Sequence, residues 1–175
     1  MEKQMKGELL DDMLDDDDNE DTQANKYLFF RIDVESYGIG IRHVIEIVEL
    51  QRISAVPDMP AYVKGVINLR GKVIPAVDLR LRFGMAEREH DDRTCIVVSE
   101  IGGVSLGFIV DTVEEVLEIP ESQVEPAPRF KTVSGKERYI AGMGKVGAQV
   151  KILLDVEKLI KEEDVAAMVD AESAT

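Results

Sequence analysis

An internal duplication constrains this 175-residue chain more than any other feature of its sequence. Three blocks recur in the same order and without internal gaps: 28–41 with 95–108, 44–49 with 113–118, and 62–79 with 139–156. Glycines and apolar residues coincide in these alignments, as at Gly40 and Gly107 or Gly65 and Gly142. Each copy alone is too short to bury a comfortable core, so the duplication predicts two small units packed on one another.

Each copy consists of short strand-like segments separated by turn residues, which predicts an all-β fold. The apolar residues are mainly Val, Ile and Leu, with only 5% aromatic residues, and such side chains favour β-sheets. We expect tight hairpins at Glu35-Ser36 and at Gly102-Gly103. The repeat places one antiparallel barrel at about 27–82 and another at about 94–155. An alternative in which the two halves exchange strands stays open.

The two ends of the chain differ from the repeats. Residues 1–26 contain ten acidic residues and three lysines, and such a segment buries too little apolar surface to offset its ordering entropy. We therefore expect a disordered acidic arm there. The spacing of Val156, Leu159, Ile160 and Met168 predicts a C-terminal helix over 156–169 with Asp155 as its N-cap, followed by a frayed tail at 170–175.

Charge and hydropathy limit the classes of partner. A net charge of −14 repels phosphate backbones and anionic lipid, so we expect neither nucleic-acid binding nor direct membrane insertion. The sequence begins without a basic segment followed by an apolar run, and no stretch has the roughly 18 apolar residues of a membrane span. The expected location is the cytoplasm.

Residues that could carry catalysis or hold a metal do not form recognisable sets. His43 and His90 are isolated from other metal-ligating residues, and YGIGI lacks the third glycine of a dinucleotide-binding turn. Cys95 lies in an apolar run and is expected to pack as a small hydrophobe. An acid/base pair formed by Asp78 and Asp111 is a weaker interpretation than helix-cap or turn acceptors. The sequence indicates a binding module without metal or cofactor, and no enzyme.

Five blocks, listed here in chain order, together resemble the CheW family of chemotaxis coupling proteins over about 26–162: YGIGIRHVIEIVE, PAYVKGVINLRGKVIPAVDLR, GFIVDTVEEVL, VEPAP and YIAGMGKVGAQVKILLDVEKL. The resemblance implies two SH3-like, five-stranded antiparallel barrels packed on each other, with a short C-terminal helix. It implies a non-catalytic adaptor, a monomer alone, that joins methyl-accepting chemoreceptor tips to the regulatory domain of the kinase CheA in membrane-associated arrays. Alternatives are a scaffold of a non-chemotaxis chemosensory pathway and a generic β-barrel interaction module.

The resemblance also implies site residues, which are given in three groups: a receptor-binding set of Val44, Glu46, Val73, Cys95 and Val113; a kinase-binding set of Lys64, Gly65, Asn68, Arg70 and Gly71; and a secondary ring contact at Phe130. Sequence alone leaves other interpretations open, because the repeat-equivalent Val44 and Val113 also suit a core, and Gly65 and Gly142 also suit a bulge in each barrel. Strands at 66–69 and 73–77 with a turn at Arg70-Gly71-Lys72 would place Arg70 outward, where the resemblance pairs it with Glu46.

Overall fold

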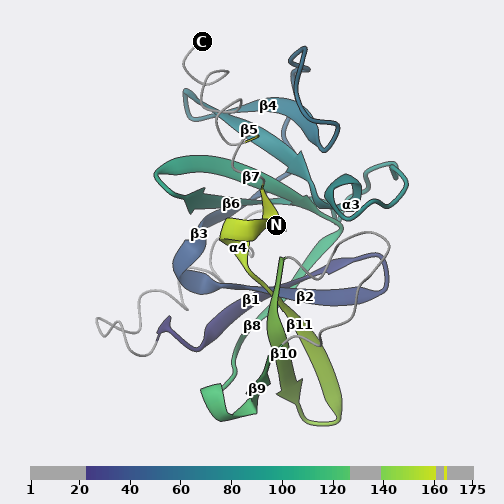
Figure 1. Ribbon diagram of the computed structural model, residues 1–175. Helices are drawn as coiled ribbons and strands as arrows, with labels where there is room; N and C mark the ends of the chain where they lie inside the picture. Colours follow the sequence, from purple (N-terminus) through teal and green to yellow (C-terminus); the bar gives the residue numbers. More distant parts are fainter. Residues whose placement is uncertain (1–22, 127–138, 161–163, 165–175) are drawn as a thin grey trace.

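The computed structural model describes residues 23–126, 139–160 and 164, which form two stacked sheets (Figure 1). The β1 sheet has the strand order β8 (Thr112–Glu118), β1 (Lys26–Ile32), β2 (Glu35–Gly40), β11 (Gln149–Leu154), β10 (Ile140–Val146) and β9 (Val124–Glu125). The β6 sheet has the order β3 (Val44–Glu49), β6 (Cys95–Ile101), β7 (Val104–Val110), β5 (Lys72–Asp78) and β4 (Val63–Leu69). The expected all-β fold of two packed barrels is confirmed.

Each sheet combines the first hairpin of one repeat with later strands of the other repeat. In the β1 sheet, β1 pairs with β8 and β2 pairs with β11; in the β6 sheet, β6 pairs with β3 and β7 pairs with β5. The sequence repeats at 27–82 and 94–155 therefore do not coincide with the two sheets, and exchanged strands are present. Because each sheet takes strands from both repeats, neither repeat can form a complete sheet alone.

Most strand pairs are antiparallel, but each sheet contains one parallel pair. These pairs are equivalent in the repeat: β11 runs parallel to β2, and β5 runs parallel to β7. Hairpins force their own strands to be antiparallel, whereas these partners are distant in sequence and are free to run in parallel. The β1 sheet exceeds the expected five strands because the two-residue β9 pairs with β10.

The hairpin turns follow the sequence prediction at one site and differ at the other. Gly102 and Gly103 join β6 to β7 with φ values of 55° and 82°, as expected for a two-residue turn. The first hairpin turns at Asp33-Val34, not at Glu35-Ser36, which pair within β2. Aspartate tolerates the left-handed φ of 58°, and the Asp33 N–H donates to Asp111 Oδ2 at 2.8 Å.

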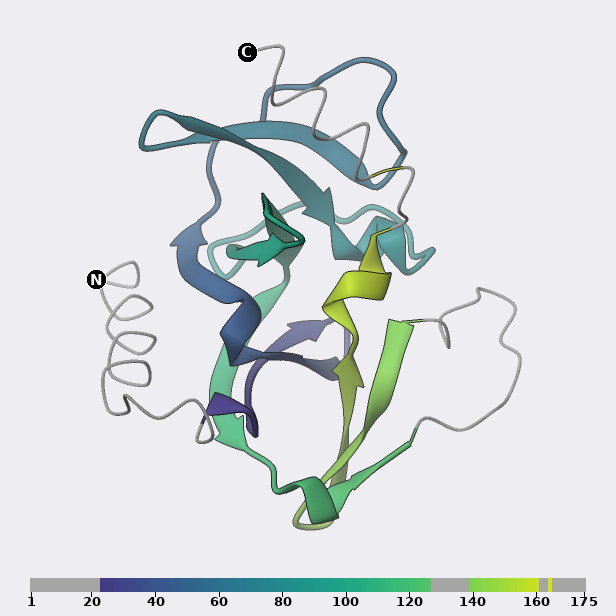
Figure 2. The same ribbon diagram turned by 60° about the vertical axis from the view of Figure 1, so that its left-hand side comes forward.

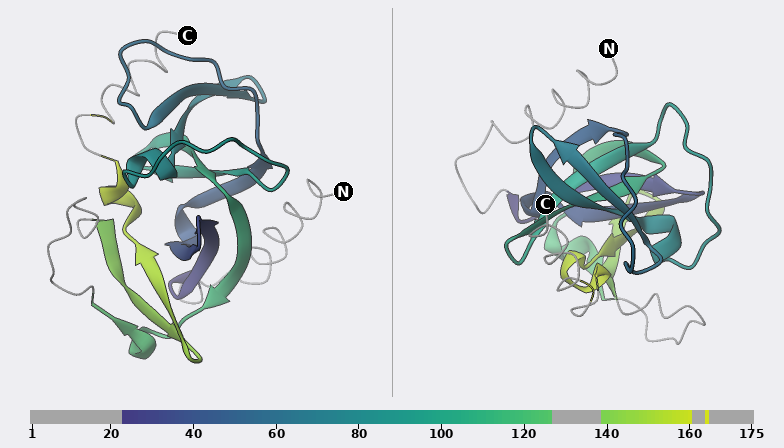
Figure 3. Two further views of the ribbon diagram at one scale, coloured as in Figure 1. Left: turned by 90° about the vertical axis from the view of Figure 1, so that its right-hand side faces the viewer. Right: turned by 90° about the horizontal axis from the view of Figure 1, so that it is seen from above.

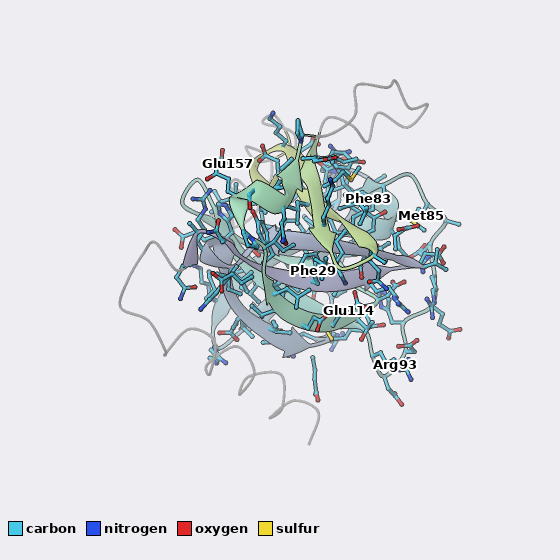
Figure 4. All side chains as sticks on the ribbon, turned by 90° about the horizontal axis from the view of Figure 1, so that it is seen from below. Phe29, Phe83, Met85, Arg93, Glu114 and Glu157 are labelled. Carbon is cyan, nitrogen blue, oxygen red and sulfur yellow. The ribbon has the colours of Figure 1, made fainter. Side chains whose placement is uncertain are left out.

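Three apolar clusters hold the structure together. One cluster fills the barrel formed by the β6 sheet (the β6 barrel), around Ile67, Ile74 and Ile96. A smaller cluster fills the barrel formed by the β1 sheet (the β1 barrel), around Phe29. Figure 4 labels Phe29 at the centre of the molecule seen from below. The largest cluster joins the two barrels and includes Phe30 and Phe83. Two small barrels thus obtain most of their core from each other, as expected for units too small to be stable alone.

Two short helices follow equivalent strands. The helix α3 (Leu79–Arg82) follows β5, and α4 (Val156–Leu159) follows β11 (Figure 2). The predicted caps are confirmed: an Asp78 carboxylate oxygen accepts from the Arg80 N–H at 2.9 Å, and Asp155 accepts from the Glu157 N–H at 3.1 Å. The predicted helix over 156–169 ends early, because α4 stops at Leu159 and Ile160 is extended, with φ −110° and ψ 131°. The remaining residues of that prediction, apart from residue 164, lie outside the described residues, as do residues 1–22 of the acidic arm and the tail at 170–175.

Candidate partner-binding surface

The turn between β4 and β5 is held in a defined shape by its own residues. Arg70 and Gly71 occupy its two positions with φ values of 53° and 86°. Such a turn matches the twist of the flanking strands, and the second position suits glycine. The Asn68 side chain accepts a hydrogen bond from the Gly71 N–H at 2.9 Å. Asn68 therefore fixes the conformation from which the Arg70 side chain leaves the sheet.

Arg70 reaches across the barrel to β3. Its Nη1 lies 2.6 Å from Glu46 Oε2, and the Arg70 side chain is 74% exposed while that of Glu46 is 24% exposed. The hydrogen bond and charge of Glu46 raise the pKa of the Arg70 guanidinium. Because β3 and β4 are the two edges of the β6 sheet, the ion pair joins the edges where the barrel closes. The pairing implied by the family resemblance is present.

A hollow opens beside this ion pair. Its lining combines apolar side chains with the charged pair and is made by Ile45, Glu46, Leu69, Arg70, Lys72, Ile74, Val98 and Ser105. Ile45 is 43% exposed, which is unusual for a large apolar side chain in this protein. Lys72 Nζ lies 3.0 Å from Ser105 Oγ at another side of the hollow. An apolar floor with a charged rim is typical of a protein-binding surface.

The receptor-binding set implied by the resemblance is only partly accessible. Val73 and Val113 are half-buried, whereas Val44 is 7% exposed. Cys95 is completely buried, with Sγ 2.9 Å from the Arg93 carbonyl oxygen, so it offers a partner no surface. Val44 and Val113 both pack against the cluster that joins the barrels. Ile45, the neighbour of Val44, is exposed and was not among the predicted residues.

Gly65 lies at a β-bulge that is repeated in the other barrel. A Cβ at Gly65, where φ is 148°, would lie 2.1 Å from the Ser54 carbonyl oxygen, and one at Gly142 would lie 2.8 Å from that of Glu125. The strand register shifts at both glycines. The chain itself therefore fills the space beside Gly65, which favours the bulge interpretation over close approach by a partner. Its neighbour Lys64 pairs with Glu87. Phe130 lies outside the described residues.

Arg80 and Asp111 form an ion pair that sequence reasoning did not identify. Arg80 donates from Nε to Asp111 Oδ1 at 2.9 Å and from Nη2 to Oδ2 at 2.6 Å. Burial raises the pKa of the Asp111 carboxyl, but hydrogen bonds from Arg80 and the Asp33 N–H outweigh it and leave the pKa below its ordinary 3.8. Asp111 is thus a turn acceptor and ion-pair partner, and Asp78 is a cap, which removes the imagined acid/base pair.

Two findings on the described residues bear on the class of protein. Across 23–126, 139–160 and 164, no cluster of three or more His, Cys, Asp or Glu side chains is arranged to hold a metal ion. The helices found in this part of the chain are all too short to cross a membrane. The fold and the surface around Glu46 and Arg70 define a two-barrel protein-interaction scaffold.

Comparisons with known proteins identify the family. The profile of the CheW-like domain matches residues 26–164. The chemotaxis protein CheW of Klebsiella aerogenes is 36% identical over 146 residues, which cover 83% of this chain and 87% of that protein. CheW of Helicobacter pylori is 34% identical over 84% of this chain and 87% of its own length. The crystal structure of the scaffolding protein TtCheW from Thermoanaerobacter tengcongensis matches with a TM-score of 0.73 at 34% identity, covering 81% of this chain and 95% of that one. The chain belongs to the CheW-like domain family and is a non-catalytic chemotaxis adaptor.

Proposed function

We propose that this protein joins the cytoplasmic tips of methyl-accepting chemoreceptors to the regulatory domain of CheA, so that receptors control kinase activity. Family membership supports this role, since the matched relatives are chemotaxis proteins and the matched structure is a scaffold. The observation that carries the proposal is the Glu46–Arg70 ion pair, which lies beside an apolar hollow on the surface. The protein would act as a monomer in the cytoplasm and be recruited to receptor arrays.

The receptor tip, a helical hairpin, would contact the edge strands β3 and β8 together with Val73 near the start of β5. Val113 and Val73 are half-buried and offer apolar surface, and the Glu46 carboxylate supplies a polar rim. Val44 would support this surface from below. Apolar anchors with a polar rim suit the docking of an amphipathic helix. This assignment drops Cys95, whose side chain is inaccessible.

CheA would contact the β4–β5 hairpin through Arg70 and the residues that order its turn. Arg70 and Gly71 are exposed at the tip, and Asn68 holds the turn by its hydrogen bond to the Gly71 N–H. Lys64 lies further along β4 on the same hairpin. Gly65 contributes indirectly, because its bulge shapes the strand that carries these residues.

Binding measurements with each partner test the proposal. The purified chain is titrated by calorimetry with a receptor cytoplasmic fragment and, separately, with the CheA regulatory domain. We expect saturable binding to both, and binding of one partner should leave the site for the other open. A chain that folds normally and binds neither partner is a generic barrel module, and the proposed function is then wrong.

A further inference from the structure

Arg82, the last residue of α3, contacts both members of a repeated tyrosine pair. Tyr62 and Tyr139 are equivalent in the sequence alignment, and they directly precede β4 and β10. The Arg82 Cζ atom lies 5.3 Å from the centre of the Tyr62 ring and 4.7 Å from that of Tyr139. Both distances are within the range of attraction between a cation and an aromatic ring. One arginine therefore holds a tyrosine from each barrel.

The same arginine also binds the helix at the equivalent position of the other repeat. Its Nε donates to the carbonyl oxygen of Leu159, the last residue of α4. Extending the repeat alignment through α3 and α4 places Leu159 at the position of Arg82. Two residues at equivalent positions of the repeat are thus in contact. Tyr62 completes the contact by donating from its hydroxyl to Asp164. We call Arg82, Tyr62, Tyr139 and Leu159 the Arg82 clasp.

Aromatic packing connects the clasp to the core between the barrels. Phe83 follows Arg82, and its ring is 5.4 Å from that of Tyr139 and 5.0 Å from that of Tyr37 on β2. Phe83 is 2% exposed. A movement of Arg82 would therefore be transmitted to side chains at the barrel interface, because close-packed interiors transmit strain.

The clasp lies on the opposite side of the interface from the proposed receptor contacts. In Figures 2 and 3, α3 and α4 are on one side of the molecule, and β3 and β8 are on the other. Val44 begins β3, and Val113 is the second residue of β8. Both valines pack against the cluster that joins the barrels, which also contains Tyr62 and Tyr139. The Arg82 clasp and the pair Val44 and Val113 thus contact the interface between the barrels at its two ends.

We propose that Arg82 is a positioning residue that fixes the relative orientation of the two barrels and thereby the spacing between β3 and β8. Lysine cannot replace it, because only a planar guanidinium stacks on two rings while donating from a fixed Nε. The consequence for receptor binding rests on the proposed function. The consequence for barrel orientation does not, since it follows from contacts within this chain.

Spin-label distances measure the orientation directly. Labels are placed at Glu49 on β3 and Glu118 on β8, which are equivalent in the repeat, in a Cys95→Ala background that leaves no other thiol. We expect a narrow distance distribution in the parent protein and a broader or shifted one in Arg82→Ala and Arg82→Lys. Arg52→Ala, at an exposed arginine of the 50–62 segment, is the matched control and should leave the distribution unchanged. Parent-like distributions in both folded Arg82 variants would overturn the proposal.

Binding of unlabelled protein gives the second readout. A mobile interface must be ordered when the receptor tip binds, so Arg82→Lys should weaken binding of a receptor fragment by roughly tenfold while affinity for the CheA regulatory domain changes less than about twofold. Should Arg82→Ala fail to fold, Arg82→Lys still decides the question, because it keeps the charge and loses the planar guanidinium. If the distance changes and receptor affinity does not, Arg82 sets the barrel orientation but not receptor binding, and only the second part of the proposal is overturned. If the parent protein binds no receptor, the proposed function is refuted instead.

Discussion

Glu46 lies on the edge strand β3 of the β6 sheet and Arg70 in the turn that follows the other edge strand, β4, and their side chains meet at 2.6 Å. The two residues are 24 positions apart in sequence, and the repeat has no arginine at the position equivalent to Arg70. The barrel therefore does not require this ion pair for its fold. Its exposed position beside an apolar hollow indicates a role in binding.

Arg70→Ala tests that role. The variant loses the ion pair and a fixed donor at the turn, but no packed surface, so we expect Tm to stay within about 1 °C of wild type. Affinity for the CheA regulatory domain should fall roughly tenfold, since charge-assisted hydrogen bonds strengthen when an interface excludes water. Arg31→Ala, at an exposed arginine on β1, is the control. Wild-type affinity for both partners would make Arg70 an ordinary turn residue.

Val113→Glu tests the receptor side. A carboxylate at this half-buried position on β8 would be desolvated under a docked helix, so we expect receptor-fragment affinity to fall at least tenfold. Binding to the CheA regulatory domain should change little. Val34→Glu, at a valine that is 77% exposed in the β1–β2 turn, is the matched control. Equal losses for both partners in a folded variant would contradict the assignment of Val113.

The variant Gly65→Ala tests whether Gly65 is required by the fold or by contact with a partner. The new methyl group would collide with the Ser54 carbonyl oxygen, so we expect a loss of about 3 kcal/mol in the free energy of unfolding, measured with urea. Gly71→Ala has a positive φ but no atom within 4 Å of its new Cβ, so its loss should be about 1 kcal/mol. A stable Gly65→Ala variant that loses only CheA binding would restore the interpretation of Gly65 as a site of partner approach.

Asp111→Asn tests the ion pair with Arg80. The folded-state pKa of Asp111 lies below its ordinary value of 3.8, so its ionised form stabilises the fold above that pH, and this contribution disappears as pH falls through the folded-state pKa. We expect the variant to be less stable by about 2 kcal/mol at pH 7, with the difference shrinking below roughly pH 4. Urea unfolding at pH 7 and pH 3.5 checks this, and a difference independent of pH would contradict it.

The duplication predicted more of the fold than any single motif. Equivalent strands, bulges at Gly65 and Gly142, and caps at Asp78 and Asp155 all follow from repeat-equivalent positions, because the same local sequence meets the same local geometry twice. Whether the barrels exchange strands could not be decided from the sequence. The pairing of strands that are distant in sequence depends on which chain connections pass from one barrel to the other. The turn at Asp33 was missed because its left-handed conformation depends on a hydrogen bond to Asp111, 78 residues away.

The burial of the predicted site residues was harder to foresee than the fold, and for a physical reason. Strand alternation indicates which side chains are apolar, but it does not separate a barrel interior from a surface groove. Cys95 and Val44 therefore proved to be core residues. Arg82 gave no signal in the sequence, because its role comes from two tyrosines 77 residues apart that the fold brings to the same point.

Co-sedimentation of all three components tests the central proposal most directly. A receptor cytoplasmic fragment assembled on vesicles is mixed with CheA, with and without this protein, and the CheA content of the pellet is measured together with kinase activity. An adaptor should bring CheA into the pellet and make its activity depend on the receptor, and Arg70→Ala should reduce both effects. CheA recovery and activity that are the same with and without the protein would contradict a coupling role.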